Sequence, residues 1–390
     1  MKLHCDDQLS TQPTFQVTRL TLTDFRNYAH VRLEPARPLV ALVGANGAGK
    51  TNLLEAVSLL MPGRGLRGVE FASLARQHGS GHWAVAAAIT TPDGDMQVGT
   101  AWAADDTGEG SNSRAVMIDG LAQRSAGALN GLLRMVWLTP AMDRLFQGAP
   151  GDRRRFLDRM VMLFDAEHAT RVNAFEKLMR ERNALLAESS PDPAWLSTLE
   201  VQMAEAAVAV SAARVGAVAT LARHIAESEH QGPFPWAEIT IAGAMEDLVT
   251  HHPAVEAEDL YRKQLRQARN LDRAAGRALA GPHRSDLRVT HGPKAMAAEF
   301  CSTGEQKALL IGLVLAQARA AKTLFGASPI LLLDEIAAHL DPARREGLFR
   351  LLEALESQVF MTGTEPSLFN GAGASAVVYQ VDSGQISESY

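Results

Sequence analysis

Residues 40–54 read VALVGANGAGKTNLL, a short apolar run followed by a glycine-rich turn and the beginning of a helical pattern. The segment matches the phosphate-binding loop pattern of glycine, four residues, and then Gly-Lys-Thr, with the strand before it and the helix after it that this pattern requires. Glycines at 44, 47 and 49 would turn several backbone N–H groups toward one anion, and the helix N-terminus would add partial positive charge there. The sequence therefore predicts a site for a nucleoside triphosphate.

The residue types of this loop have separate chemical roles. Lys50 would reach the β- and γ-phosphates, and the hydroxyl of Thr51 would coordinate Mg²⁺. The alternative is a glycine-rich turn that binds nothing, which the complete match with both flanks disfavours. The predicted nucleotide-contacting residues of the loop are Gly44, Ala45, Asn46, Gly47, Ala48, Gly49, Lys50, Thr51 and Asn52.

The composition excludes several classes of protein. The formal net charge of -6 gives no general basic signature, so a nucleic-acid surface would have to be a local patch. The two cysteines, Cys5 and Cys301, lack metal-type spacing and suit a reducing compartment. The polar N-terminus lacks the apolar core of a signal peptide, and the longest apolar run, residues 308–318, is too short to span a bilayer. We expect a cytoplasmic protein with no membrane partner.

The pattern along the 390 residues predicts a nucleotide lobe interrupted by a helical insertion. Residues 15–140 contain short strands, residues 141–280 are mainly helical, and residues 281–390 return to strands and helices. Residues 1–14 are expected to be a disordered extension. The predicted fold is α/β, with a mixed sheet, helices and an antiparallel β subdomain in one lobe and an inserted α-helical arm.

The insertion contains three long helical patterns, residues 152–186, 193–229 and 253–279. A helix as long as the second would extend roughly 50 Å, so we expect two or three antiparallel helices that form a projecting arm. In the nucleotide lobe, the DFRNY segment at residues 24–28 is expected to form an exposed turn between two strands.

A second half of the site lies near the C-terminus, where the aliphatic run ILLL leads into Asp334 and Glu335. Ligands of doubly wound folds lie beyond the carboxyl ends of such strands. Asp334 would bind Mg²⁺, and Glu335 would orient or deprotonate the attacking water. A strand ending in Asp-Glu is common by itself, but a phosphate loop requires a partner that bears the magnesium aspartate.

The helix before that strand opens with Ser302-Thr-Gly-Glu-Gln306. A serine at a helix start is ordinarily an N-cap, but this order resembles the signature motif of the ATP-binding-cassette superfamily. The resemblance implies that Ser302, Gly304 and Gln306 contact ATP held by an opposite protomer. Residues 338–341, AHLD, resemble the dimer-contacting loop of the same superfamily, which implies a role for Asp341. Two copies would then enclose two nucleotides.

Four further stretches resemble the RecF family within the SMC, Rad50 and RecF branch of these ATPases. They are LTDFRNY (22–28), DRRRFLD (152–158), GPHRSDL (281–287) and QVFMTGT (358–364), and the similarity covers about residues 15–385. The resemblance implies an ATP-dependent homodimer that clamps double-stranded and gapped DNA and hydrolyses ATP slowly. It further implies RecO- and RecR-like mediators that help to load a RecA-like recombinase, and a switch role for Thr362.

The chain departs from the family pattern at two places. Ser285 stands where the family usually has the first of two aspartates, and PAMD (140–143) replaces the usual Pro-Glu. Asp143 and Gln147 are both candidates for the residue that senses the nucleotide there.

Arginines in the insertion are candidates for binding DNA phosphates. Five of them recur at intervals of three and four and would share one helix face, although such faces are more often simply solvated. No base-reading element is evident, so binding would follow the DNA backbone. The candidates are Arg262, Arg266, Arg269, Arg273 and Arg277, together with Arg153, Arg154 and Arg155 and, near the nucleotide, Arg64 and Arg67.

Two other functions were considered. An energy-coupling ATPase subunit of a membrane transporter is disfavoured by the long insertion and by Thr362 where transporters place a switch histidine. A structural SMC-type ATPase is disfavoured because the insertion is too short for a long coiled coil and lacks a hinge.

Overall fold

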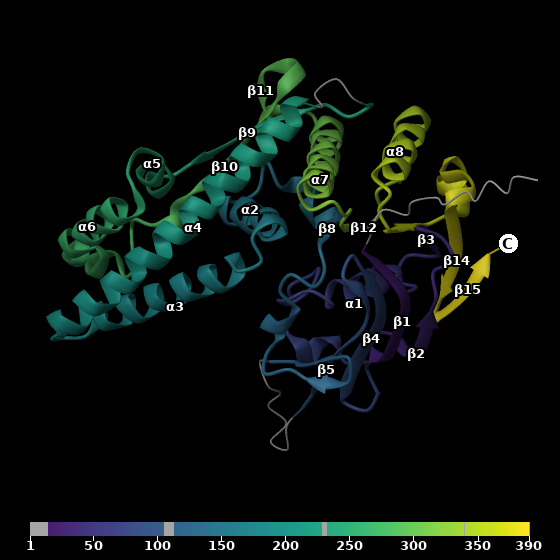
Figure 1. Ribbon diagram of the computed structural model, residues 1–390, viewed down its shortest axis with the longest axis horizontal. Helices are drawn as coiled ribbons and strands as arrows, with labels where there is room; N and C mark the ends of the chain where they lie inside the picture. Colours follow the sequence, from purple (N-terminus) through teal and green to yellow (C-terminus); the bar gives the residue numbers. More distant parts are fainter. Residues whose placement is uncertain (1–14, 105–112, 228–231, 339, 390) are drawn as a thin grey trace, which may run out of the picture. The chain divides into compact units, whose positions relative to one another are not determined.

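The computed structural model describes residues 15–104, 113–227, 232–338 and 340–389 (Figure 1). The expected disorder of residues 1–14 lies outside the described residues. The chain divides into two compact units, of which one comprises Met1–Thr139 and Ala321–Tyr390 and the other Pro140–Ala320. We call them the nucleotide unit and the helical unit.

The nucleotide unit contains a six-stranded sheet in the order β15-β14-β3-β13-β12-β8. All its neighbouring pairs are parallel except β14 with β15. All residues of β3, β12 and β13 are buried, as expected for parallel strands covered on both faces. The strands are β3 (Leu39–Val43), β8 (Met135–Leu138), β12 (Ile330–Leu333), β13 (Val359–Gly363), β14 (Ala376–Asp382) and β15 (Gln385–Ser389).

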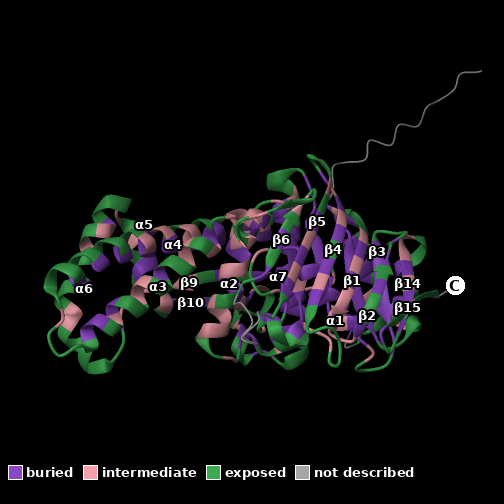
Figure 2. Ribbon diagram, turned by 90° about the horizontal axis from the view of Figure 1, so that it is seen from below, coloured by how far each residue is buried: buried purple, intermediate pink, exposed green. Residues whose placement is uncertain are grey.

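A second sheet of the same unit is antiparallel, in the order β2-β1-β4-β5-β6-β7. Buried positions recur at every second residue along β4, and Figure 2 shows this alternation as purple bands. The two sheets confirm the predicted α/β fold with an antiparallel subdomain. The strands are β1 (Gln16–Phe25), β2 (Tyr28–Leu33), β4 (His82–Thr91), β5 (Gly94–Ala103), β6 (Ala115–Ile118) and β7 (Leu121–Ala122).

Helices α1 (Lys50–Ser58) and α8 (Pro342–Leu355) complete the nucleotide unit, with short 3-10 turns between the strands. Its core contains Trp83, whose ring meets the edge of Phe25 at a centroid distance of 5.6 Å. Arg114 is buried, and it donates to the carbonyls of Leu59 and Met61 just after the end of α1. A buried cation therefore satisfies backbone carbonyls of the loop that follows the helix.

The helical unit packs its helices along their length, and α3, α4 and α6 lie side by side in Figure 1. Leu185 packs near Leu196, whereas Phe175 packs near Met203, so α3 and α4 are antiparallel. The helices are α2 (Pro150–Phe164), α3 (His168–Ala187), α4 (Pro193–Glu227), α5 (Ala244–His251), α6 (Ala254–Ala275) and α7 (Thr303–Phe325), of which α7 continues to the unit boundary.

One helix expected to be continuous is interrupted, and another ends early. The pattern at residues 152–186 forms α2 and α3, because Asp165 adopts an extended conformation and its carboxylate accepts from the N–H of Glu167 at 3.0 Å. The third predicted helix ends at Ala275, where Gly276 adopts the left-handed conformation that closes many helices. Periodicity alone could not reveal either stop.

A three-stranded sheet in the order β11-β10-β9 belongs to the helical unit. Its strands are β9 (Ala237–Ala242), β10 (Asp286–His291) and β11 (Met296–Ala297). Arg153 of α2 donates to both carboxylate oxygens of Asp286, at 2.7 and 2.9 Å, and so ties α2 to β10. Residues 281–320, which we expected in the nucleotide lobe, therefore group with the helical unit.

Helices α4 and α7 are long and apolar enough by composition to cross a membrane. Half of the apolar window of α4 and 67% of that of α7 is buried inside the protein, as in core helices. The apolar run at residues 308–318 is thus explained by packing.

Candidate nucleotide site

The phosphate loop connects β3 to α1, as the sequence predicted. Gly44 has φ 154° and Gly49 φ 118°, and a Cβ on Gly44 would lie 2.2 Å from the carbonyl oxygen of Val381. Only glycine fits that position, because the neighbouring strand approaches so closely. The loop thus has the conformation that its glycines predict.

Lys50 is buried, and its ammonium donates to the carbonyl oxygens of Gly44 and Ala45 at 2.7 and 2.9 Å. Burial lowers the pKa of Lys50, while the carboxylates of Glu335 and Asp334 raise it. A lysine held by neutral carbonyls can transfer its hydrogen bonds to phosphate oxygens, because anionic acceptors bind a cation more strongly. The loop therefore fits a triphosphate.

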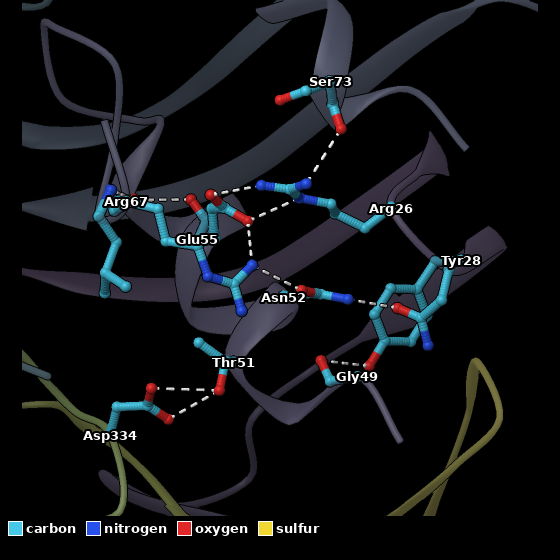
Figure 3. A network of polar contacts seen from close by, with 12 residues as sticks. Arg26, Tyr28, Gly49, Thr51, Asn52, Glu55, Arg67, Ser73 and Asp334 are labelled. Carbon is cyan, nitrogen blue, oxygen red and sulfur yellow. Dashed lines mark hydrogen bonds and ion pairs between the residues drawn. The ribbon is translucent and has the colours of Figure 1, made fainter. Parts of the chain in front are cut away.

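The carboxylate of Asp334 meets the loop at the carboxyl ends of the parallel strands β12, β13 and β3. The hydroxyl of Thr51 donates to its two oxygens at 2.9 and 3.1 Å (Figure 3). Thr362, at the end of β13, donates to the same carboxylate at 2.7 Å and accepts from the N–H of Glu335 at 2.8 Å. Thr362 lies close to Asp334 because β13 is the strand between β12 and β3 in the sheet.

Thr51 and Asp334 are the pair that could hold Mg²⁺. The described residues contain no cluster of three or more His, Cys, Asp or Glu side chains suited to a metal. One hydroxyl and one carboxylate are nevertheless sufficient for magnesium, which keeps several waters and takes other ligands from phosphates. Glu335 follows directly, with a left-handed φ of 53°.

The DFRNY turn is not exposed, so that prediction is wrong. Tyr28 is fully buried, and its hydroxyl donates to the carbonyl of Gly49 at 3.0 Å (Figure 3). Asn27 donates to the carbonyl of Ala48 at 2.9 Å and accepts from Asn52 at 2.8 Å. The turn supports the phosphate loop from behind. Sequence reasoning missed this role because the contact spans 21 positions between Tyr28 and Gly49.

A charged cluster lies beside this support, on α1. Glu55 is fully buried and accepts from Arg26 at 2.9 Å and from Arg67 at 2.7 Å (Figure 3). Arg67, a candidate for DNA contact, also donates to Asn52 at 2.9 Å. Its charge is thus compensated inside the unit, whereas Arg64 is exposed.

The predicted signature segment lies in the helical unit at the start of α7. Ser302 and Glu305 form a capping box, in which the N–H and hydroxyl of Ser302 donate to the Glu305 carboxylate at 3.0 and 2.9 Å. Hydrogen bonds from Lys294 and Ser302 lower the pKa of Glu305 to about 2. Gly304 is exposed, and no atom would meet a Cβ there within 4 Å.

Gln306 differs from its expected role. Its buried amide donates to the carbonyls of Cys301 and Glu299 at 2.8 and 3.4 Å. The side chain therefore stabilises the loop that precedes α7. Asp341, on the nucleotide unit, is the N-cap of α8 and accepts from the N–H of Arg344 at 2.9 Å. Ser302 and Asp341 thus each cap the start of a helix.

The α6 arginines do not form one free face. Arg269 binds the buried carboxylate of Glu200 at 2.6 Å, and Arg277 lies beyond the end of the helix. Arg262 pairs with Asp259, and Arg273 donates to the carbonyl of Glu188. Arg266 is exposed, and no ion pair is formed by it within the described part of the chain.

Ser285, the departure from the family pattern, is buried and donates to the carboxylate of Glu246 at 2.5 Å. The same glutamate lies 3.6 Å from Arg214. An acidic group therefore occupies this place from α5. Of the two candidates for nucleotide sensing, Asp143 accepts from Lys307 at 3.2 Å and Gln147 is exposed.

The nucleotide unit is that of a P-loop ATPase head of the SMC type, because it joins a phosphate loop on β3 to a carboxylate strand on β12. The family model described as the RecF/RecN/SMC N terminal domain matches residues 16–387. The chain is 51% identical to a Mesorhizobium japonicum "DNA replication and repair protein RecF", over 95% of this chain and 97% of that protein. A Brucella suis protein of the same description is 47% identical over 98% and 99%. The chain belongs to the RecF family.

Solved structures agree with this fold. The structure described as "the recombination mediator protein RecF-ATP in RecFOR pathway" superposes with a TM-score of 0.85 at 21% identity, covering 98% of this chain and all of that one. An Smc head domain from Pyrococcus furiosus gives a TM-score of 0.52 at 16% identity, covering 96% of each chain. The predicted resemblance to the RecF family is confirmed.

Proposed function

We propose that this chain is an ATP-dependent DNA-binding protein of recombinational repair and replication restart, which dimerises on binding ATP and Mg²⁺. The observation that carries the proposal is the network of Thr51, Asp334 and Thr362 beside Lys50, since it unites the phosphate loop with a magnesium aspartate. Its 51% identical relative is a DNA replication and repair protein, and a structural neighbour is described with ATP.

Each residue of the site would have a separate role. Lys50 would exchange the carbonyls of Gly44 and Ala45 for the β- and γ-phosphates, and the loop N–H groups would bind the remaining oxygens. Thr51 and Asp334 would hold Mg²⁺, which supplies charge neutralisation at the phosphates. Glu335 would orient the attacking water, while Thr362 fixes the positions of Asp334 and of the Glu335 backbone.

Dimerisation would complete the site from a second copy. Ser302 and Gly304 lie at the N-terminus of α7, where free N–H groups and a hydroxyl suit an anion. In the capping box the hydroxyl of Ser302 donates its one proton to Glu305, so contact with a phosphate would require this hydrogen bond to be exchanged. We propose that these residues of one protomer contact the γ-phosphate bound by the other, and that Asp341 lies at the contact.

The dimer would clamp double-stranded DNA near gaps and release it after slow hydrolysis. Mediators similar to RecO and RecR would act with it to load a RecA-like recombinase, consistent with the "RecFOR pathway" in the description of its structural neighbours. DNA contact would come from exposed arginines such as Arg64, Arg266, Arg273 and Arg277, because electrostatic attraction to phosphates requires accessible charge.

Nucleotide-dependent dimerisation tests the proposal. Glu335→Gln should lower hydrolysis by about 100-fold or more and hold the ATP-bound dimer, because the water loses its general base. Lys50→Ala should remain monomeric with ATP. Glu353→Gln, the same change on the exposed face of α8, should behave as the unmodified protein. Sedimentation with and without ATP and gapped DNA measures this. A chain that stays monomeric and free of DNA in every condition would refute the proposal.

A further inference from the structure

The helical unit contains a cavity of about 170 Å³ between α2, α3, α4 and the 3-10 turn Pro282–Arg284. One wall is apolar, with Val172, Phe175 and Val210, and the remaining lining carries three arginines and two acids, Arg154, Arg155, Arg214, Asp158 and Glu176. Three guanidinium groups around one small space repel one another. The cavity therefore requires an account of where its positive charge is balanced.

Two of these arginines converge at Gly151, the second residue of α2. A Cβ built on Gly151 would lie 3.7 Å from Nη2 of Arg154 and 4.0 Å from Nη1 of Arg155. Both guanidinium groups therefore point at one place beside the backbone. Glycine lowers the stability of a helix interior, but here the missing side chain leaves space between the two cations.

The ion pairs inside the cavity are unequally distributed. Arg214 is compensated, because both oxygens of Asp158 accept from it at 2.9 Å. Arg155 is exposed and, among the residues that the structure describes, pairs with the half-buried Asp152 of its own helix, and such pairs are weak. Arg154 donates to a neutral group, the carbonyl of Ser285, at 2.8 Å, and forms no ion pair within the described segments. The uncompensated charge is thus that of Arg154, with Arg155 beside it.

The environment of Arg154 disfavours its positive charge. Burial lowers its pKa, and the neighbouring cations Arg214 and Arg284 lower it further, against the opposing effect of Asp286 and Asp158. An anion at this place would relieve both the desolvation and the repulsion.

The N-terminus of α2 adds to the same field. The helix has 15 residues, and its N-cap is Ala149, which makes no side-chain cap hydrogen bond. Partial positive charge at an uncapped helix start attracts anions within the first turn, where Gly151 lies.

We propose that Gly151, Arg154 and Arg155 form a phosphate site that binds one phosphate group of a DNA strand. This inference rests on the proposed DNA binding and assigns it a place. The cavity is large enough for a phosphate but small for a whole nucleotide, and Arg154 and Arg155 each direct a guanidinium nitrogen toward the space beside Gly151. The adjacent apolar wall of Val172 and Phe175 suits the deoxyribose. Arg153, which the sequence grouped with them, is engaged by Asp286 and takes no part.

Two variants of the full chain test this site. Arg154→Gln keeps an amide donor for the carbonyl of Ser285 but removes the charge. Gly151→Asp places a carboxylate between the two arginines, in a helix position where acids are favoured, so its fold should be retained. Arg288→Gln on β10 is the matched control, because Arg288 is exposed and does not line the cavity. Circular dichroism and ATP binding verify the fold of each variant.

Fluorescence anisotropy with a gapped duplex, at several salt concentrations with ATP, gives the readout. Each cavity variant should bind about tenfold more weakly, and the slope of log affinity against log salt should decrease by about one, as for one lost phosphate contact. Two gapped duplexes, with a phosphate or a hydroxyl at the 5′ end inside the gap, distinguish binding of a terminal phosphate from binding of a backbone phosphate. Weaker binding of the cavity variants to either duplex supports the site.

The outcomes separate the two proposals. If the unmodified protein and the Arg288→Gln control bind DNA, while both cavity variants match them in affinity and salt slope, the phosphate site is refuted and the proposed function stands. If the unmodified protein binds no DNA with ATP, both are refuted.

Discussion

The nucleotide site and the centre of the helical unit are both built around a buried cation, and they treat it differently. In the helical unit, Arg182 is fully buried and donates to Glu200 at 3.1 Å, to Asp272 at 2.6 Å and to the carbonyl of Leu265 at 2.7 Å. In the nucleotide unit, Lys50 donates to two neutral carbonyls. Arg182 is neutralised within the fold, whereas Lys50 can still bind an anion.

The difference separates a structural charge from a functional one. A buried ion network holds helices in register. In this network α3 contributes Arg182, α4 contributes Glu200 and α6 contributes Asp272. A cation bonded to neutral groups is electrostatically incomplete, as is Arg154 in the helical unit. Burial alone therefore does not indicate function, and Arg114, which is buried and bonded to backbone carbonyls in a structural role, shows that neutral partners indicate function only where an anion can reach the cation.

The largest effect is expected at Arg182. Arg182→Met should lower the free energy of unfolding by about 3–5 kcal/mol, because it leaves the buried carboxylates of Glu200 and Asp272 without their common partner. Arg266→Met, on the exposed face of α6, should change stability by less than about 0.5 kcal/mol. Urea unfolding measures both. Equal effects of the two changes would contradict the distinction between compensated and exposed arginines.

An intermediate effect is expected at Tyr28. Tyr28→Phe removes the hydrogen bond to Gly49, which should cost about 1 kcal/mol and weaken nucleotide binding about fivefold. Tyr379→Phe is the matched control in the same unit, since its hydroxyl donates to the carbonyl of Glu34 at 3.1 Å, outside the phosphate loop. It should reduce stability and leave nucleotide affinity unchanged. Titration with a fluorescent nucleotide measures the affinity of both variants. If Tyr28→Phe and Tyr379→Phe bind the nucleotide equally tightly, Tyr28 does not support the loop.

The smallest effect concerns Asp24, at the start of the DFRNY turn. Hydrogen bonds from Ser80 and then Arg76 lower the pKa of Asp24 to about 2. Because the folded-state pKa is depressed, its contribution to stability is present above the unfolded value near 3.8 and is lost as pH falls toward 2. Ser80→Ala should raise the pKa of Asp24 toward 3.8. Carboxyl-carbon NMR between about pH 1.5 and 5.5 spans both values and follows this shift, and an unchanged titration would exclude Ser80 as its main cause.

Local patterns predicted the parts of the site whose chemistry is contiguous in sequence. The glycines of the phosphate loop determine their own backbone conformation, and the apolar run before Asp334 forms a buried strand by composition alone. Helix α4 begins at Pro193, the residue predicted for its start, because its periodic stripe is long and uninterrupted. Interactions between residues close in sequence were sufficient to predict these elements.

Partners distant in sequence could not be predicted in the same way. Nothing near Asn27 and Tyr28 indicates the loop they support, and nothing near Arg269 indicates that Glu200 neutralises it. The three consecutive arginines 153–155 have the same local pattern but differ in their partners, because successive helical positions point about 100° apart.

The sequence by itself therefore determined the fold class, the phosphate loop, the carboxylate strand and the family, since each depends on residues a few positions apart. Only the tertiary structure decided which charges are compensated. An ion pair forms between side chains that the fold brings together, so Arg153 is engaged by Asp286, whereas Arg154 remains without a countercharge in the described chain.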